Sequence, residues 1–140
     1  GYRAWGSDIT PNDSPFEAGL GWAVKLKSNA DFLGRKASER FASQPLKKRL
    51  VGFTVDDREV VLVGRETIMR NGKPVGYLTS AGYGYTIGQP IGYGYVRHAD
   101  GVSDDFILGG SYQLEVATEL VGCKVHLGAM YDREMSRVRR

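Results

Sequence analysis

The sequence is poor in cysteine and in long apolar runs, and each absence excludes a class of protein. Cys123 is the only cysteine among 140 residues, so the chain forms no internal disulfide and offers no cysteine cluster for zinc or an iron–sulfur centre. Such sparing use of cysteine points to a reducing compartment. No apolar run approaches the roughly 20 residues that a membrane span needs, and no charged-then-apolar leader opens the chain. We therefore expect a protein that is neither membrane-spanning nor secreted.

Recognisable catalytic motifs are also scarce. His98 and His126 have no second metal ligand nearby in the sequence, so neither shows the spacing of a metal site. No nucleophile elbow, phosphate-binding loop or dinucleotide-binding glycine motif occurs in a strand–turn–helix context. We assign no catalytic residue and no metal ligand within these 140 residues.

The charge pattern argues against a nucleic-acid partner. The net charge is only +3, and the excess lies mainly in two clusters: Lys47, Lys48 and Arg49, and the C-terminal Arg133, Arg137, Arg139 and Arg140. Such clusters are solvated faces or sites that attract an anion. Four tyrosines alternate with glycine between positions 83 and 95, but no lysine or arginine lies between Ser80 and Tyr95. Stacking aromatics without basic neighbours do not make a nucleic-acid site, so we interpret them as part of two paired strands.

The stretch from Thr10 to Leu26 carries the most specific local signals. Ser14, Pro15 and Glu17 have the spacing of a helix N-cap, first helical position and capping box. The following residues 20–26 alternate apolar and small or polar side chains, which predicts a short strand that presents Trp22. From the pattern alone, Trp22 is either a core residue or an aromatic cover for a ligand.

A helix and a change of pattern follow. Residues 32–42 place apolar side chains at near-helical spacing, and Asp31 is a suitable N-cap. Pro45 ends this helix because the residue before a proline is pushed out of the α region. We place a domain boundary here, so that residues 1–45 form a separate unit.

Residues 48–132 show strand patterns separated by turn signals. The clearest is Asn71-Gly72, the sequence preferred in two-residue type I′ hairpins. We expect further turns at Gln89-Pro90 and at residues 119–121. The fold class predicted is mainly β: a small Greek-key or jelly-roll-like barrel of about six strands, preceded by a loop, a short strand and one helix as an α+β remnant. Residues 133–140 form a basic tail.

Four blocks of this sequence resemble a known family. Residues 1–37 contain RAWGSDI and P-F-E-A-G-L, and the later blocks are RLVGF, NGKPVGYLTS and PIGYGYV. They are similar to the C-terminal part of the glycine-cleavage T-protein (aminomethyltransferase) superfamily, and most similar to the folate-binding region of sarcosine and dimethylglycine dehydrogenases. The resemblance implies that residues 1–45 are the end of the folate-binding domain and that residues 48–132 are the C-terminal barrel.

The resemblance also implies a function and a ligand. The intact protein would transfer a one-carbon unit to tetrahydrofolate, with or without a polyglutamate tail, and Trp22 would pack on the folate. Glu17 is a second candidate folate contact, and Glu17 and Asp8 are otherwise turn or cap residues. By the resemblance, the family's catalytic carboxylates lie upstream of Gly1, in N-terminal domains that are missing here. These domains would be partners of this region within the same chain. In the dehydrogenases, a missing N-terminal part would also bind FAD. The location implied is the cytoplasm, or the mitochondrial matrix in a eukaryote.

Two other parents stay open. One is a stand-alone aminomethyltransferase of the same superfamily. The other is a non-catalytic relative that keeps the fold as a regulatory or interaction module. The sequence upstream of Gly1 distinguishes these two proteins from the flavin-linked dehydrogenase. A dinucleotide-binding glycine motif there indicates the flavoenzyme, and loss of both upstream carboxylates indicates the non-catalytic relative.

Overall fold

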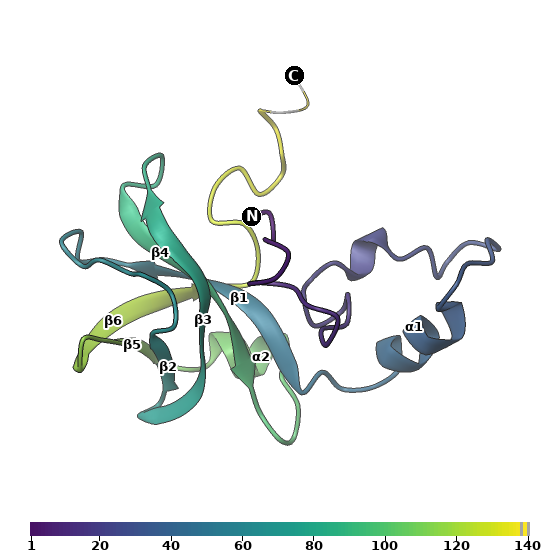
Figure 1. Cartoon of the computed structure of the whole chain (residues 1–140), viewed down its shortest axis with the longest axis horizontal. Helices are drawn as coiled ribbons and strands as arrows, with labels where there is room; N and C mark the ends of the chain where they lie inside the picture. Colours follow the sequence, from purple (N-terminus) through teal and green to yellow (C-terminus); the bar gives the residue numbers. More distant parts are fainter. Residues whose placement is uncertain (138, 140) are drawn as a thin grey trace.

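Six antiparallel strands close into a barrel, as expected from the alternating pattern (Figure 1). The structure is a computed structural model that describes residues 1–137 and 139. Neighbours around the barrel are β1-β4-β3-β2-β5-β6, and β6 pairs back to β1. The strands are β1 (Lys48–Val55), β2 (Thr67–Arg70), β3 (Lys73–Gly84), β4 (Gln89–Arg97), β5 (Tyr112–Val116) and β6 (Glu119–His126). Because β2, β3 and β4 follow one another while β1 lies beside β4, this half of the barrel is a Greek key.

The apolar core fills the barrel. Phe53 of β1 is fully buried and its ring lies 5.6 Å from that of Tyr112 on β5. The other fully buried apolar side chains of this core come from strands β1 to β5 and from a short helix: Val51, Val55, Ile68, Leu78, Val96, Ile107 and Leu114. The barrel therefore has the continuous interior that a folding unit of this size needs.

The hairpin turns are partly where the sequence places them. Asn71 and Gly72 join β2 to β3 with φ of 50° and 75°, so both residues adopt the left-handed conformation of the predicted hairpin. The predicted turn at Gln89-Pro90 is wrong, since both residues lie in β4 and the chain turns at residues 85–88 instead. Proline is accommodated there at the beginning of a strand.

The last hairpin also turns earlier than predicted. Ala117 and Thr118 turn between β5 and β6 with φ of 48° and 72°, whereas the predicted turn residues 119–121 already belong to β6. Neither Ala117 nor Thr118 is a typical left-handed residue, so no recognisable turn signal marks this position.

A short helix within the barrel region has no counterpart in the sequence prediction. This helix, α2 (Asp104–Leu108), begins at Ser103, whose Oγ accepts a hydrogen bond from the backbone N–H of Phe106 at 3.1 Å. Its residue Ile107 is fully buried against the barrel core. Five residues are too few for a helical period to emerge from the pattern, although the Ser103 cap is a usable signal.

The N-terminal segment, residues 1–45, is less regular than predicted. It contains one helical turn, η1 (Gly21–Ala23), and one α-helix, α1 (Arg35–Ala42). The prediction of a helix in this region is confirmed, but Asp31 is not its N-cap. Gly34 precedes the first helical residue with φ of 88°.

The predicted strand over residues 20–26 is wrong. The N–H groups of Ala23 and Val24 bond to the carbonyls of Leu20 and Gly21, which closes a tight turn in place of an extended strand. A strand needs a neighbour to satisfy its backbone, and no strand pairs with this stretch in the part of the chain that the structure describes.

The N-terminal segment lies along one side of the barrel and α1 projects away from it (Figure 1). Its first residues run beside the chain that follows β6, because a methyl group on Gly1 would lie 2.8 Å from the side chain of Ala129. Within residues 1–137 and 139, no helix is long and apolar enough to cross a membrane.

Candidate functional site

Asp8 fixes the N-terminal segment to the outer wall of the barrel. Its carboxylate is buried, with 3% of the residue exposed. One oxygen accepts a hydrogen bond from the backbone N–H of Ala4 at 3.0 Å, and the other from the hydroxyl of Thr79 on β3 at 2.6 Å. The backbone carbonyl of Asp8 accepts a third bond from the hydroxyl of Tyr95 on β4 at 2.9 Å. Two strands thus hold one residue of the segment.

Tyr95 stays a neutral donor in this arrangement. Burial raises the pKa of its phenol well above the ordinary value, and the nearby carboxylates of Asp13, Glu17 and Asp8 raise it further. A phenol that keeps its proton can donate to the Asp8 carbonyl at any physiological pH. The contact is therefore insensitive to pH in that range.

A second attachment lies at the beginning of β1. The ammonium group of Lys48 lies 2.5 Å from a carboxylate oxygen of Asp13 and 5.1 Å from the ring centre of Tyr95. Burial raises the pKa of Asp13, but the hydrogen bonds from Lys48 and Thr10 outweigh it and hold the pKa below its ordinary value. Asp13 is therefore ionised, and the ion pair is formed at neutral pH.

Glu17 occupies the capping box that the sequence predicts. One of its carboxylate oxygens accepts hydrogen bonds from the backbone N–H and the hydroxyl of Ser14, each at 2.8 Å. The Ser14 hydroxyl in turn accepts from the backbone N–H of Glu17 at 3.3 Å. The carbonyl of Glu17 accepts from the backbone N–H of Leu50 on β1 at 2.8 Å. The structure thus gives Glu17 a local role in shaping the turn before Trp22.

Trp22 follows this anchored turn and points into solvent. It lies at the centre of η1, and 84% of the residue is exposed. A methyl group on the preceding Gly21 would lie 2.8 Å from the ring of Phe16, so a glycine is needed there for the close approach. Of the two interpretations open from the sequence, burial of Trp22 in the core of this chain is wrong. Among the described residues, no hydrogen bond joins Trp22 to Glu17.

A cleft of about 300 Å³ opens where the N-terminal segment meets the β3–β4 hairpin. Its floor comes from the two strands and its wall from the segment. The lining residues are Tyr2, Ala4, Asp8, Ser80, Ala81, Gly82, Tyr83, Ile91, Gly92 and Tyr93. Burial raises the pKa of the Tyr93 phenol, so this hydroxyl also stays protonated.

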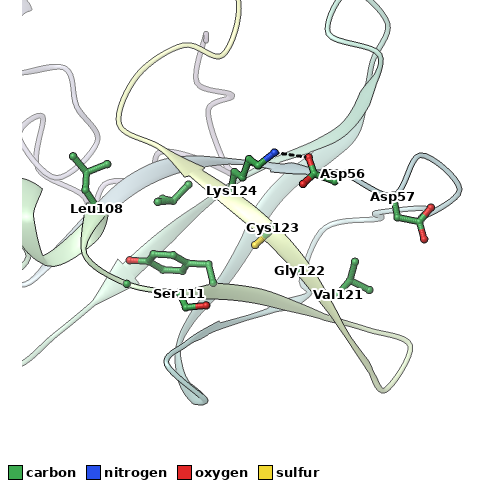
Figure 2. A pocket seen from close by; sticks show the side chains of 11 residues that line it. Asp56, Asp57, Leu108, Ser111, Val121, Gly122, Cys123 and Lys124 are labelled. Carbon is green, nitrogen blue, oxygen red and sulfur yellow. Dashed lines mark hydrogen bonds and ion pairs between the residues drawn. The ribbon is translucent and has the colours of Figure 1, made fainter.

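A larger depression of about 710 Å³ lies between β5, β6 and the end of β1 (Figure 2). Lys124 forms an ion pair of 2.9 Å with Asp56 at its edge, and both side chains are largely exposed. Burial raises the pKa of the Cys123 thiol to about 12, so this thiol is not a ready nucleophile. No group of three metal-ligating side chains occurs among residues 1–137 and 139.

The sequence predicted the turn at Ser14 and Glu17, but it did not predict the barrel residues that hold the N-terminal segment. It named Asp8 as a turn or cap residue, whereas the structure buries it against Thr79 and Tyr95. These partners lie 71 and 87 residues away along the chain, so no local pattern could reveal them. The available signal was weak: Asp8 is a carboxylate in a short segment with few other charges.

Known proteins share both the sequence and this fold. The family model of the glycine cleavage T-protein C-terminal barrel domain matches residues 48–132. The chain is 43% identical over 141 residues to mitochondrial sarcosine dehydrogenase of Mus musculus, an alignment that covers 99% of this chain and 15% of that protein. It is 42% identical over 95 residues to mitochondrial dimethylglycine dehydrogenase of Mus musculus, covering 68% of this chain and 11% of the relative.

A solved structure agrees with this grouping. The crystal structure of glycine cleavage system aminomethyltransferase T from Bartonella henselae superposes with a TM-score of 0.72 at 29% identity, over 89% of this chain and 34% of that one. This chain therefore spans only a small part of the length of these relatives. The barrel and the resemblance predicted from the sequence are both confirmed, and the chain belongs to the family of the glycine cleavage T-protein C-terminal barrel domain.

Proposed function

We propose that this chain is the C-terminal part of an enzyme of the sarcosine or dimethylglycine dehydrogenase type that transfers a one-carbon unit to tetrahydrofolate. Two relatives named for these activities support it, and the alignment with the sarcosine dehydrogenase extends over nearly the whole chain, including residues 1–45. In this proposal residues 1–45 complete a folate-binding domain that precedes the barrel.

The observation that carries the proposal is the exposure of Trp22 on an anchored turn. A large aromatic with 84% of its surface exposed has no packing role in this chain, yet the capping box of Ser14 and Glu17 fixes the backbone just before it. Exposed aromatics on a rigid turn are suited to cover a flat ligand ring. Trp22 thus fits the pterin or aminobenzoate ring of a folate, and Glu17 would act by shaping the turn or by a direct contact.

The remaining chemistry is assigned to upstream parts of the enzyme. Folate supplies the nitrogen atoms that accept the one-carbon unit, and proton transfer there needs a carboxylate close to them. Among the described residues, neither nearby carboxylate is directed at Trp22. Glu17 accepts hydrogen bonds from Ser14, and Asp8 is buried against β3. We propose that the acid–base pair and an FAD site lie upstream, and that the protein works in the mitochondrial matrix or the cytoplasm.

A stand-alone aminomethyltransferase is the second candidate. The superposition on the Bartonella henselae aminomethyltransferase favours it, since 89% of the chain is covered. The two candidates differ in one readout. The intact dehydrogenase carries a flavin absorbance and oxidises an N-methyl amine, whereas the transferase has neither property.

The test is a tetrahydrofolate titration of the intact enzyme and of three variants. We expect Trp22→Phe to keep most of the affinity and Trp22→Ala to lose about ten-fold or more, as removal of one stacking partner predicts. Trp5→Ala is the matched control, because Trp5 lies in the same segment and is 74% exposed. Unchanged affinity in Trp22→Ala would remove Trp22 from the site.

A second measurement concerns the 140-residue chain by itself. We expect it to show no turnover of sarcosine or dimethylglycine with tetrahydrofolate, since it supplies only an aromatic cover and no acid–base pair. Measurable turnover by the purified chain would show that its own residues hold the catalytic groups.

A further inference from the structure

The chain is held on both sides of Trp22, but by different means. Upstream, the capping box of Ser14 and Glu17 fixes the turn, and the carbonyl of Glu17 accepts a hydrogen bond from Leu50 of β1. Downstream, residues 24–34 lie away from the barrel, on the way to α1 (Figure 1). In the part of the chain that the structure describes, no hydrogen bond joins residues 24–34 to a barrel strand. The downstream side is therefore fixed from within the N-terminal segment.

Arg35, the first residue of α1, provides this attachment. Its guanidinium group donates to three backbone carbonyls of the preceding loop: Leu26 at 2.9 Å, Ser28 at 2.9 Å and Ala30 at 2.7 Å. Its Nε–H donates to the carboxylate of Glu39, one turn further along α1, at 2.9 Å. A guanidinium group has five N–H donors, and four bonds engage most of them here. One side chain thus gathers the loop against the beginning of the helix.

The surroundings of Arg35 favour these bonds. Only 24% of its side chain is exposed, so water competes weakly for the donors. The ring centre of Phe32 lies 5.8 Å from the guanidinium carbon, and the carboxylate of Glu39 balances its charge. Gly34 precedes the helix with φ of 88°, a conformation that glycine adopts without strain. The loop and the helix therefore meet at Arg35 with its charge paired and most of its donors satisfied.

Two consecutive turns connect Trp22 to these contacts. The N–H of Val24 bonds to the carbonyl of Gly21 at 3.1 Å, which closes the turn that contains Trp22. The N–H of Leu26 bonds to the carbonyl of Val24 at 2.8 Å. The two turns share Val24, and the carbonyl of Leu26 is one of the three that Arg35 holds. A shift of Leu26 therefore changes the direction of the turn that carries the indole.

We propose that Arg35 is a positioning residue of the folate site, which acts through Trp22 and does not contact the ligand. The inference rests on the proposed folate contact of Trp22. It requires the planar guanidinium group, because an ammonium group presents its three donors from one point and cannot reach the carbonyls at positions 26, 28 and 30 together. Arg35→Lys therefore keeps the positive charge and removes the geometry.

The test is a double-mutant cycle of Arg35→Lys and Trp22→Ala, measured by tetrahydrofolate titration of the intact enzyme. In the unsubstituted enzyme, we expect Arg35→Lys to weaken tetrahydrofolate binding by about three- to ten-fold. In the Trp22→Ala enzyme, the same substitution should change the affinity by less than about two-fold, because the ring that Arg35 positions is gone. Equal losses in the two backgrounds would show that Arg35 acts independently of Trp22 and would overturn the proposal.

The same cycle separates this inference from the proposed function. A loss of affinity in Trp22→Ala without any loss in Arg35→Lys overturns the role of Arg35 and leaves the folate contact of Trp22 intact. An unchanged affinity in Trp22→Ala removes that folate contact, and with it the role of Arg35 in folate binding.

Arg40→Lys is the matched control on the same helix. The guanidinium group of Arg40 lies 5.7 Å from the ring centre of Phe41 and donates no hydrogen bond among residues 1–137 and 139. We expect Arg40→Lys to leave the tetrahydrofolate affinity unchanged. A loss equal to that of Arg35→Lys would mean that any such change on α1 disturbs the site, and it would overturn the specific role of Arg35.

The turn can also be followed without folate. In the 140-residue chain, the heteronuclear ¹⁵N nuclear Overhauser effect of the amides of Trp22, Val24 and Leu26 reports motion on the picosecond-to-nanosecond timescale. Arg35→Lys should lower this value at the three amides and leave it unchanged in β1, whereas Arg40→Lys should change neither. Unchanged values in Arg35→Lys would show that its contacts do not hold the turn, and would overturn the proposal whether or not Trp22 binds folate.

Discussion

The barrel and the N-terminal segment are stabilised in opposite ways. The barrel buries a continuous apolar interior, with residues such as Phe53 and Leu114 fully inaccessible to solvent. The N-terminal segment fully buries only Asp8, Ser14 and Ala18, and five of its large apolar side chains are exposed: Tyr2, Trp5, Trp22, Leu33 and Phe41. Its attachment to the barrel consists mainly of hydrogen bonds and one ion pair.

The difference shows which region is able to fold by itself. Burial of apolar surface is the main source of folding free energy, and the segment has almost none of its own. Hydrogen bonds to the barrel fix the position of the N-terminal segment, but they do not provide the segment with an apolar core. We propose that residues 48–132 are one folding unit, and that residues 1–45 keep their shape because the barrel wall holds them.

The largest effect should come from the barrel core. Phe53→Ala is expected to cost about 3–5 kcal/mol of unfolding free energy, because it removes a fully buried ring and leaves a cavity beside Tyr112. Urea denaturation followed by circular dichroism measures this. A loss below about 1 kcal/mol would mean that the interior is loosely packed and that the contrast between the two regions is overstated.

Removal of residues 1–45 should have the next largest effect. The remaining chain is expected to unfold in one cooperative transition, less stable by about 2–6 kcal/mol because four contacts disappear at about 0.5–1.5 kcal/mol each. These are the hydrogen bonds of Tyr95 and Thr79 to Asp8, the bond of Leu50 to Glu17 and the ion pair of Lys48 with Asp13. A melt without a cooperative transition would contradict the boundary at residues 46–47.

The ion pair between Asp13 and Lys48 should account for a smaller, pH-dependent share. Asp13→Asn is expected to cost about 1–2 kcal/mol at pH 7, since a charge-assisted bond is lost and Lys48 keeps an unpaired charge. The pKa of Asp13 in the folded chain lies below its ordinary value of 3.8, so its stabilisation is present above pH 4 and is lost as the pH falls below that value.

The check is a pair of stability curves from pH 7 to pH 3. The unsubstituted chain and Asp13→Asn should converge as the acidic limit is approached, because protonation removes the same charge that the substitution removes. A constant gap over the whole range would show that the ion pair is not the source of the difference.

The smallest effect on stability is expected at Trp22. Because 84% of this residue is exposed, Trp22→Ala should change the free energy of unfolding of the 140-residue chain by less than about 0.5 kcal/mol. Phe53→Ala, measured in parallel, is the contrast with a buried aromatic. A loss of several kcal/mol for Trp22→Ala would mean that the ring packs against this chain after all.

Local features of the sequence predicted the local features of the fold. The capping box of Ser14 and Glu17 and the left-handed hairpin of Asn71 and Gly72 follow from neighbours within four positions, so their side chains and backbone preferences were enough. The alternating strands predicted a barrel, because apolar side chains at every second position require a shared interior. The resemblance of whole blocks supplied the family.

Contacts between distant residues were decided only by the tertiary structure. The alternation around Trp22 looked like a strand, but a strand exists only with a paired neighbour and none lies beside it in the described chain. The turn at Ala117-Thr118 arose because the pairing of Val116 with Glu119 fixes the register, whatever the local preference.

Asp8 is the clearest case of that division. Its sequence neighbours mark a turn, whereas its burial, its bonds to Thr79 and Tyr95 and the cleft beside it exist only once β3 and β4 have paired. The physical reason is that the energy of a polar side chain depends on which partners surround it, and these partners are brought together by the closure of the barrel. Composition, caps and alternation thus determined the barrel itself, and closure of the barrel decided which surface residues became a site.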